Sequence, residues 1–236
     1  MIYILIAALA PVVMLLYYIY RKDEFQKEPV KEVLKAFGLG VASTLLSLMI
    51  SGPLGAMGLY PAEHTNVGGA IAISFFGAAI PEEIAKFLLF WLFVRRNKYF
   101  DEHMDGIVYA AAVSLGFAGL ENIMYLVSAG NDWIATGITR ALFSVPGHFF
   151  FGILMGYYYS LVRFDPLTPA INKFWVLGAP ILAHGIFDTI LFASGVLPEF
   201  LALILMIVFI WFCNSLRKQA SRRIRLHLAQ DGAVQG

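Results

Sequence analysis

An apolar stretch at residues 68–94 contains two adjacent carboxylates and an ammonium group, those of Glu82, Glu83 and Lys86. The stretch is long enough to cross a bilayer, because a spanning helix needs about 20 residues. A charged side chain near the centre of a membrane costs at least about 2.5–3.5 kcal/mol, so such charges persist where they have partners or a function. The chain must therefore bury these three groups together inside a membrane-embedded fold.

The composition agrees with a membrane protein. Hydrophobic residues make up 59% of the chain and charged residues only 14%, with a mean hydropathy of +0.73, whereas soluble domains contain about 25% charged residues. Cys213 is the single cysteine, which excludes an intrachain disulfide and a thiolate zinc cluster. We expect no nucleic-acid partner, because the chain has no basic domain and no aromatic platform.

Several apolar segments predict an all-α, polytopic membrane bundle of about seven transmembrane helices. They cover residues 2–20, 31–50, 68–94, 105–128, 140–162, 173–193 and 197–214. An eighth short helix within residues 51–66 remains an alternative. We expect the first segment to be a retained helix rather than a cleaved signal peptide, because no basic residue precedes it. Residues 1–216 then form a single domain, and residues 217–236 form a basic tail that anchors on lipid headgroups.

The distribution of positive charge predicts the orientation of the bundle. Nearly all of the 17 Lys and Arg residues lie in the tail or near the loops that follow the first, third and fifth apolar segments. The exceptions are Lys86, inside the third segment, and Arg140, at the start of the fifth. Because positive residues favour the cytoplasmic side, we expect the N-terminus outside and the C-terminus in the cytoplasm. Arg140 is expected to extend toward lipid headgroups, or alternatively to gate the outer mouth of a site.

A small set of polar side chains remains inside the apolar segments once the loops are set aside. Beyond the third segment, these side chains are Glu121, Asn122, His148, His184 and Asp188. Counting residues along helices of alternating direction places the groups between the bilayer midplane and the outer leaflet. Prolines shortly before Glu82, His148 and His184 indicate helix bends that border protein or water. Together these features predict one water-filled cavity that opens outward.

Two histidines and several carboxylates in a buried cavity are suited to peptide hydrolysis. A zinc ion bound by two His and one carboxylate keeps a position for water and lowers the pKa of that water toward about 7. A further glutamate can then take and return the proton. A metal-free alternative activates the water with Glu82 or Glu83 paired with a histidine, while the remaining polar groups stabilise the oxyanion.

The remaining polar residues have expected supporting roles. Lys86 is expected to be the charge partner of the two glutamates. Asp188 lies one helical turn after His184 and is expected to orient its imidazole, or alternatively to bind metal. Asn122 is a candidate contact for the oxyanion or the substrate, and His103 is expected to be a bystander in a loop.

The order of these motifs resembles the PrsW family of bacterial intramembrane proteases, which are relatives of the CAAX prenyl protease (type II) and ABI group. The matching motifs are Glu82-Glu83-x-x-Lys86, Phe117-Ala118-x-x-Glu121-Asn122, His148 and His184-x-x-x-Asp188. Residues 27–30 and 101–109 also resemble the family, and the likeness extends over residues 3–215.

The resemblance implies a multi-pass endopeptidase of the bacterial cytoplasmic membrane. Its implied substrate is a single-pass anti-sigma factor, which receives the first, outward-side cut of regulated intramembrane proteolysis in a stress response. The wider group is classed with metallopeptidases, whereas a glutamate–water mechanism is argued for the prenyl-protease relatives. His148, His184 and Glu121 are the candidate ligands of a Zn²⁺ ion, and Glu121 departs from the pattern of those relatives, which carry a histidine there.

Two functions of other classes remain as alternatives. A proton-coupled transporter could use the same buried Glu, His and Asp side chains as a relay, although the sequence has no detectable inverted repeat. A non-enzymatic scaffold could bind a partner helix at the same place.

Overall fold

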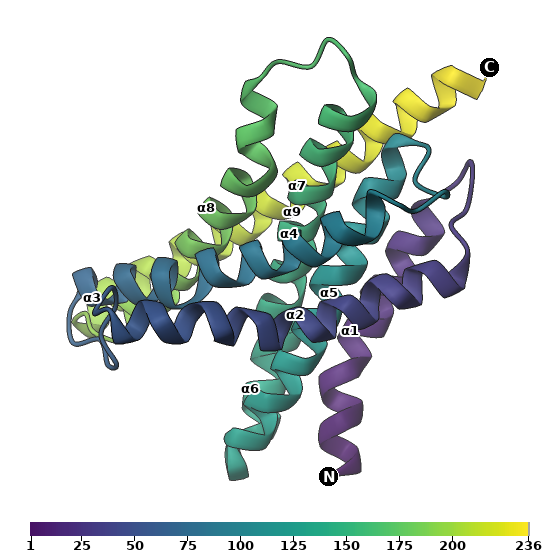
Figure 1. Ribbon diagram of the computed structural model, residues 1–236. Helices are drawn as coiled ribbons and strands as arrows, with labels where there is room; N and C mark the ends of the chain where they lie inside the picture. Colours follow the sequence, from purple (N-terminus) through teal and green to yellow (C-terminus); the bar gives the residue numbers. More distant parts are fainter. Residues whose placement is uncertain (236) are drawn as a thin grey trace.

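The computed structural model describes residues 1–235, and the described chain is almost entirely helical, with no strand (Figure 1). This confirms the all-α prediction. The elements in chain order are α1 (Ile2–Lys22), α2 (Val30–Ala56), α3 (Val67–Ala72), the π-helix η1 (Ile73–Ala79), α4 (Ile80–Val94), α5 (His103–Ser128), the 3₁₀-helix η2 (Gly130–Asp132), α6 (Trp133–Thr139), the π-helix η3 (Arg140–Ser144), α7 (Val145–Phe164), α8 (Ile171–Ser194) and α9 (Glu199–Gln235).

The lengths of the helices support a multi-pass membrane protein. Six segments of the described chain are long and apolar enough to cross a membrane: α1, α2, α5, Gly130–Phe164, α8 and Glu199–Ala233. The expected third helix is divided into α3, η1 and α4, each shorter than 18 residues. The count of seven and the orientation of the termini stay predictions. The alternative of an eighth helix within residues 51–66 is not seen, because α2 extends to Ala56 and turns follow it.

Two helices change their winding immediately before a proline. The π-helix η1 leads directly into α4, which has Pro81 in its first turn. The π-helix η3 likewise leads directly into α7, which has Pro146 in its first turn. Proline cannot donate the backbone hydrogen bond that an α-helix needs at that point. Single π-turns are a known adjustment inside helices and are frequent at functional sites. By contrast, Pro180 lies within the uninterrupted α8.

Helix α5 is the centre of the bundle and packs against α1, α2, α4, α7 and α9 (Figure 1). Every residue from 104 to 119 on this helix is buried. Its small side chains allow neighbouring backbones to approach closely. A Cβ atom added at Gly40 of α2 would overlap the carbonyl oxygen of Val113, and one added at Gly156 of α7 would overlap that of Gly106. These close contacts fix the position of α5. They thereby also fix the position of Glu121, which lies toward the C-terminus of the same helix.

The basic tail is the second half of one long helix. The expected helix at 197–214 and the tail that follows it together form α9, which crosses the bundle in Figure 1. Leu216, Ala220 and Ile224 are buried, and His227 stacks on the ring of Tyr157 with 4.5 Å between ring centroids. One face of the tail therefore packs against the protein, and the anchoring of the tail on lipid headgroups stays a prediction.

Candidate active site

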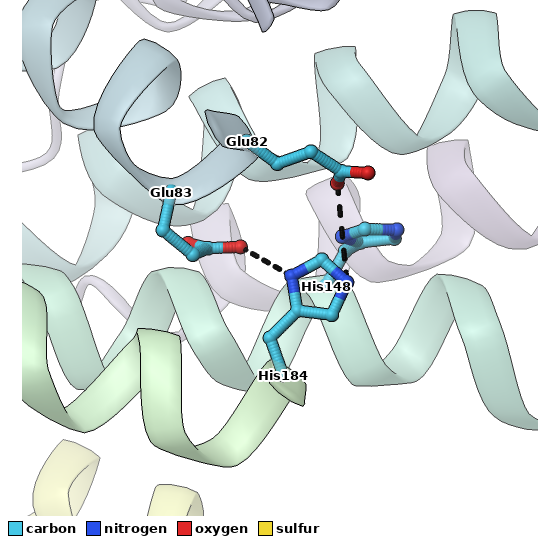
Figure 2. Close-up of side chains that lie close together, drawn as sticks. All are labelled: Glu82, Glu83, His148 and His184. Carbon is cyan, nitrogen blue, oxygen red and sulfur yellow. Dashed lines mark hydrogen bonds and ion pairs between the residues drawn. The ribbon is translucent and has the colours of Figure 1, made fainter. Parts of the chain in front are cut away.

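The polar side chains singled out in the sequence converge where α4, α5, α7 and α8 meet. Figure 2 shows Glu82 and Glu83 reaching from α4 toward His184 of α8, with His148 of α7 beside them. Hydrogen bonds and ion pairs at 3.3 Å or less join the whole set into one network, either directly or through Lys86 and Arg140.

Lys86 lies at the centre of this network and is completely buried. Its Nζ atom is 2.8 Å from Oε1 of Glu83, 3.3 Å from Oε2 of Glu82 and 3.0 Å from Nδ1 of His148. The same nitrogen lies 4.0 Å from the centroid of the Phe117 ring. An ammonium group has three N–H donors, so these three partners satisfy all of them.

The contacts of His148 define its tautomer. Because an ammonium group can only donate, Nδ1 of His148 accepts from Lys86. The proton of a neutral imidazole then lies on Nε2, which donates to Oε2 of Glu121 at 3.0 Å. Both ring nitrogens of His148 therefore have partners within the protein.

His184 lies between three carboxylates. Its Nδ1 atom is 2.9 Å from Oε1 of Glu83, while Nε2 is 3.3 Å from Oδ2 of Asp188 and 3.9 Å from Oε2 of Glu82 (Figure 2). The ring stacks on Phe151, with 4.8 Å between centroids. A lone pair on Nε2 would face carboxylate oxygens, so this nitrogen must present either a proton or a bound cation to them. Asp188 thus lies where the i,i+4 spacing predicted it.

A cavity of about 470 Å³ borders the network. This size is typical of sites that bind small molecules. The site residues that line it are Glu82, Glu121, His148, His184 and Asp188, together with Arg140 and Tyr125. Glu83, Lys86 and Asn122 do not line it. The two adjacent glutamates are therefore in different positions, one at the cavity wall and one behind it.

Arg140 lies inside the site, whereas the preferred expectation placed it at the lipid headgroups. It was expected to extend toward headgroups, but its Nη2 lies 2.6 Å from Oε2 of Glu121 and its Nε donates to Oδ1 of Asn122 at 2.8 Å. The guanidinium also lies 4.0 Å from the centroid of the Tyr125 ring. The available signal was Glu121 itself, because a carboxylate inside an apolar segment needs a cation at its own depth.

Asn122 does not face the cavity. Its amide nitrogen donates to the carbonyl of Ala8 at 2.9 Å and its oxygen accepts from Arg140. The side chain is completely buried. The residue therefore links α1 to α5 and holds Arg140, a position that differs from the expected contact with substrate.

A metal ion could be held by four of these residues. Glu82, Glu83, His148 and His184 each offer a ligand atom within 4.8 Å of the others. Imidazole nitrogen and carboxylate oxygen are suitable ligands for zinc, and Oε2 of Glu83 is a buried oxygen with no hydrogen-bond partner. The residues present thus fit such an ion. Glu121, a predicted ligand, lies outside this group of four and pairs with Arg140.

The fold and the site together define a class: a multi-pass membrane protein with a buried Glu/His site that borders a cavity and is suited to hydrolysis. The family model described as "PrsW family intramembrane metalloprotease" matches residues 28–213. The chain therefore belongs to the PrsW family and is a peptidase that acts within a membrane, which confirms the resemblance stated above.

Individual relatives cover most of the chain. "Protease PrsW" of Bacillus subtilis (strain 168) is 36% identical over 94% of this chain and 97% of its own length. The protein of the same name from Geobacillus kaustophilus is 38% identical over 80% of this chain and 79% of its own length. The protein of that name from Clostridioides difficile is 31% identical over 86% of this chain and 83% of its own length. No solved structure matches the chain.

Proposed function

We propose that this peptidase hydrolyses a peptide bond of a single-pass membrane protein near the outer side of the bacterial cytoplasmic membrane. The observation that carries the proposal is the meeting of Glu82, His184 and Asp188 at the wall of one cavity. The resemblance to the family supports an anti-sigma factor as the substrate, with cleavage that starts regulated intramembrane proteolysis. The predicted orientation supports an outward-side cut.

We assign the role of general base to Glu82. Its side chain is 13% exposed and lines the cavity, whereas the side chain of Glu83 is completely buried. A carboxylate at the cavity wall can take a proton from the attacking water and return it to the leaving amine. Glu83 instead holds Nδ1 of His184, and the opposite nitrogen of that ring then faces the reacting atoms.

Positive charge at the same wall suits the developing oxyanion. His184 can donate from Nε2, and Arg140 places a guanidinium on the cavity lining. Donors that are already fixed in a water-poor site stabilise such charge strongly. Glu121 and Asn122 hold Arg140, so we assign them positioning roles rather than direct contact with the oxyanion.

A divalent metal would be held by Glu83, His148 and His184, a set of two imidazoles and one carboxylate as in known zinc peptidases. It would have to displace Lys86 from Nδ1 of His148. When bound, such an ion would supply Lewis acidity to the attacking water and the scissile carbonyl. In the metal-free alternative, Glu82 and His184 perform the proton transfers alone. Both versions leave Glu82 as the base.

Cleavage by purified protein tests the proposal. A candidate single-pass membrane substrate is incubated with the parent protein, with Glu82→Gln and with Glu63→Gln, which changes an exposed loop carboxylate. We expect Glu82→Gln to lose about 10²–10⁴-fold in rate and Glu63→Gln to match the parent. Full activity in Glu82→Gln would rule out Glu82 as the general base. Binding of the substrate without cleavage by the parent protein would favour the scaffold alternative.

A further inference from the structure

A second group of buried carboxylates lies at the opposite end of α5 from Glu121. Asp23 caps the C-terminus of α1 and Glu28 lies in the connection to α2, while Glu102 caps the N-terminus of α5 and Asp105 lies in its first turn. Each of these four side chains is at most 6% exposed. The group is adjacent to the basic loops and is separate from the active site.

One oxygen of each carboxylate has a donor. The N–H of Glu28 donates to Oδ2 of Asp23 at 2.9 Å, and the N–H of Glu102 donates to Oδ2 of Asp105 at 2.7 Å. The hydroxyl of Tyr109 donates to Oε2 of Glu28, and the side chain of Glu102 accepts from the backbone of Asp105 in a capping box. The protein therefore holds each carboxylate in a fixed orientation.

The second oxygens of three of these carboxylates have no donor. Oδ1 of Asp23, Oε1 of Glu28 and Oδ1 of Asp105 are buried without a hydrogen-bond partner. The four carboxyl groups form one cluster, because oxygens of Asp23, Glu102 and Asp105 lie within 4.8 Å of one another and the carboxyl of Glu28 is close enough to that of Asp105 to share a proton with it. A buried acceptor without a partner costs about 1–3 kcal/mol, and more when it is charged.

The surroundings supply little compensating positive charge. Lys27 acts on Asp23 from a distance, and His103 is already paired with Asp231 at 2.9 Å. Burial, with a further contribution from neighbouring acids, raises the pKa of Glu28 and that of Glu102 to about 7. The ionised cluster thus lacks a counter-charge of its own.

We propose that Asp23, Glu28, Glu102 and Asp105 bind a hard divalent cation, Mg²⁺ or Ca²⁺, which joins α1 and the α1–α2 connection to the N-terminus of α5. Carboxylate oxygens without nitrogen or sulfur ligands are the donors that these cations prefer. This donor set differs from the imidazole-containing set of the active site, which suits zinc.

The cation would hold α5, the central helix of the bundle, in position. Asp231 of α9 binds the same helix end, accepting from the backbone N–H groups of His103 and Met104 at 2.9 Å each. On this helix Glu121 follows Asp105 by 16 residues, or roughly 24 Å at 1.5 Å per residue. The site is therefore structural, and it acts on the active site only through the position of α5.

The test uses the full chain in detergent, treated with EDTA and exchanged into buffer at about pH 8, above the pKa of about 7 that burial gives Glu28 and Glu102. Mg²⁺ and Ca²⁺ are added in separate titrations, with K⁺ at matched ionic strength as the control, and both the melting temperature and the heat of binding are measured. We expect either cation to raise the melting temperature by several degrees. The cation with the larger effect identifies the preferred ligand.

Two variants locate the effect. Asp23→Asn keeps an acceptor for the N–H of Glu28 and removes a charge, so we expect at least about a tenfold loss of cation affinity. Glu24→Gln changes the neighbouring acid, whose side chain is 58% exposed, and should behave as the parent does. Glu28→Gln, which keeps an acceptor for Tyr109, serves as a second cluster variant should Asp23→Asn fail to fold.

Two results would overturn the proposal. One is a parent protein whose melting temperature responds no more to Mg²⁺ or Ca²⁺ than to K⁺. The other is an equal response in the parent and in the cluster variants. If the carboxyl groups share protons with one another instead of binding a cation, the first result is expected. In that case Asp23→Asn should also be more stable than the parent when no divalent cation is added.

Discussion

The ammonium nitrogen of Lys86 lies 3.0 Å from Nδ1 of His148 and thereby joins α4 to α7 inside the active site. This contact leaves Nε2 of His148 as the donor to Glu121. The same ammonium forms ion pairs with the carboxylates of both Glu82 and Glu83 within its own helix. One buried cation therefore sets both the charge of the site and the orientation of an imidazole.

Lys86→Met is expected to destabilise the protein strongly. Methionine has a similar length and fills the space, but it leaves buried carboxylates without their counter-ion. Removing one partner of a buried ion pair costs about 3–5 kcal/mol. The measurement is thermal unfolding of the purified variant in detergent, with Lys98→Met, at an exposed loop position, as the control. Equal melting temperatures for the two variants would show that the carboxylates do not depend on Lys86.

Arg140→Gln is expected to lower activity by removing the cation that holds Glu121. A hydrogen bond to a charged group contributes about 1.5–3 kcal/mol, and the 2.6 Å contact with Glu121 is of this kind. Arg140→Lys should restore little, because a lysine cannot bond to Glu121 and Asn122 together in the geometry of a guanidinium fork. Cleavage rates of both variants are compared with that of Arg163→Gln, an exposed position. Full rescue by lysine would mean that charge alone matters at this position.

The metal content of the purified protein tests the family's description as metalloproteases. We expect elemental analysis to find zinc bound at the imidazole-containing group, and His184→Ala to lose it together with activity. Asp23→Asn, which alters only the distant carboxylate cluster, should retain the zinc. Undiminished cleavage after exhaustive chelation, with no zinc detected, would instead favour the glutamate–water mechanism.

The sequence was sufficient to predict which side chains converge, because charges inside apolar segments must meet one another. It could not separate Glu82 from Glu83, since the rotation of α4 depends on how η1 alters the winding before Pro81. Arg140 was misjudged for a similar reason: an arginine near a helix end can reach either lipid or a buried acid, and only the packing of η3 beside α5 decides between them.

The carboxylate cluster at the other end of α5 was visible in the sequence only as scattered loop acids. Asp23 and Glu102 are 79 positions apart, and nothing in either local pattern predicts that both become buried. His103 was likewise expected to be a bystander, yet it pairs with Asp231 of α9. The long continuation of α9 brings that partner to the N-terminus of α5, which the basic composition of the tail did not indicate.

A glycine pair on α2 tests the packing that positions α5. Gly40 faces the backbone of Val113, and a Cβ atom there would overlap its carbonyl oxygen, whereas nothing lies within 4 Å of a Cβ atom built at Gly38. Gly40→Ala must push two helices apart and is expected to cost at least about 1–3 kcal/mol, the usual cost of overpacking. Gly38→Ala should be neutral or stabilising by up to about 1 kcal/mol, because alanine favours the helix. Thermal unfolding of both variants in detergent measures the difference. Equal stability would show that α2 and α5 do not approach as closely as this packing requires.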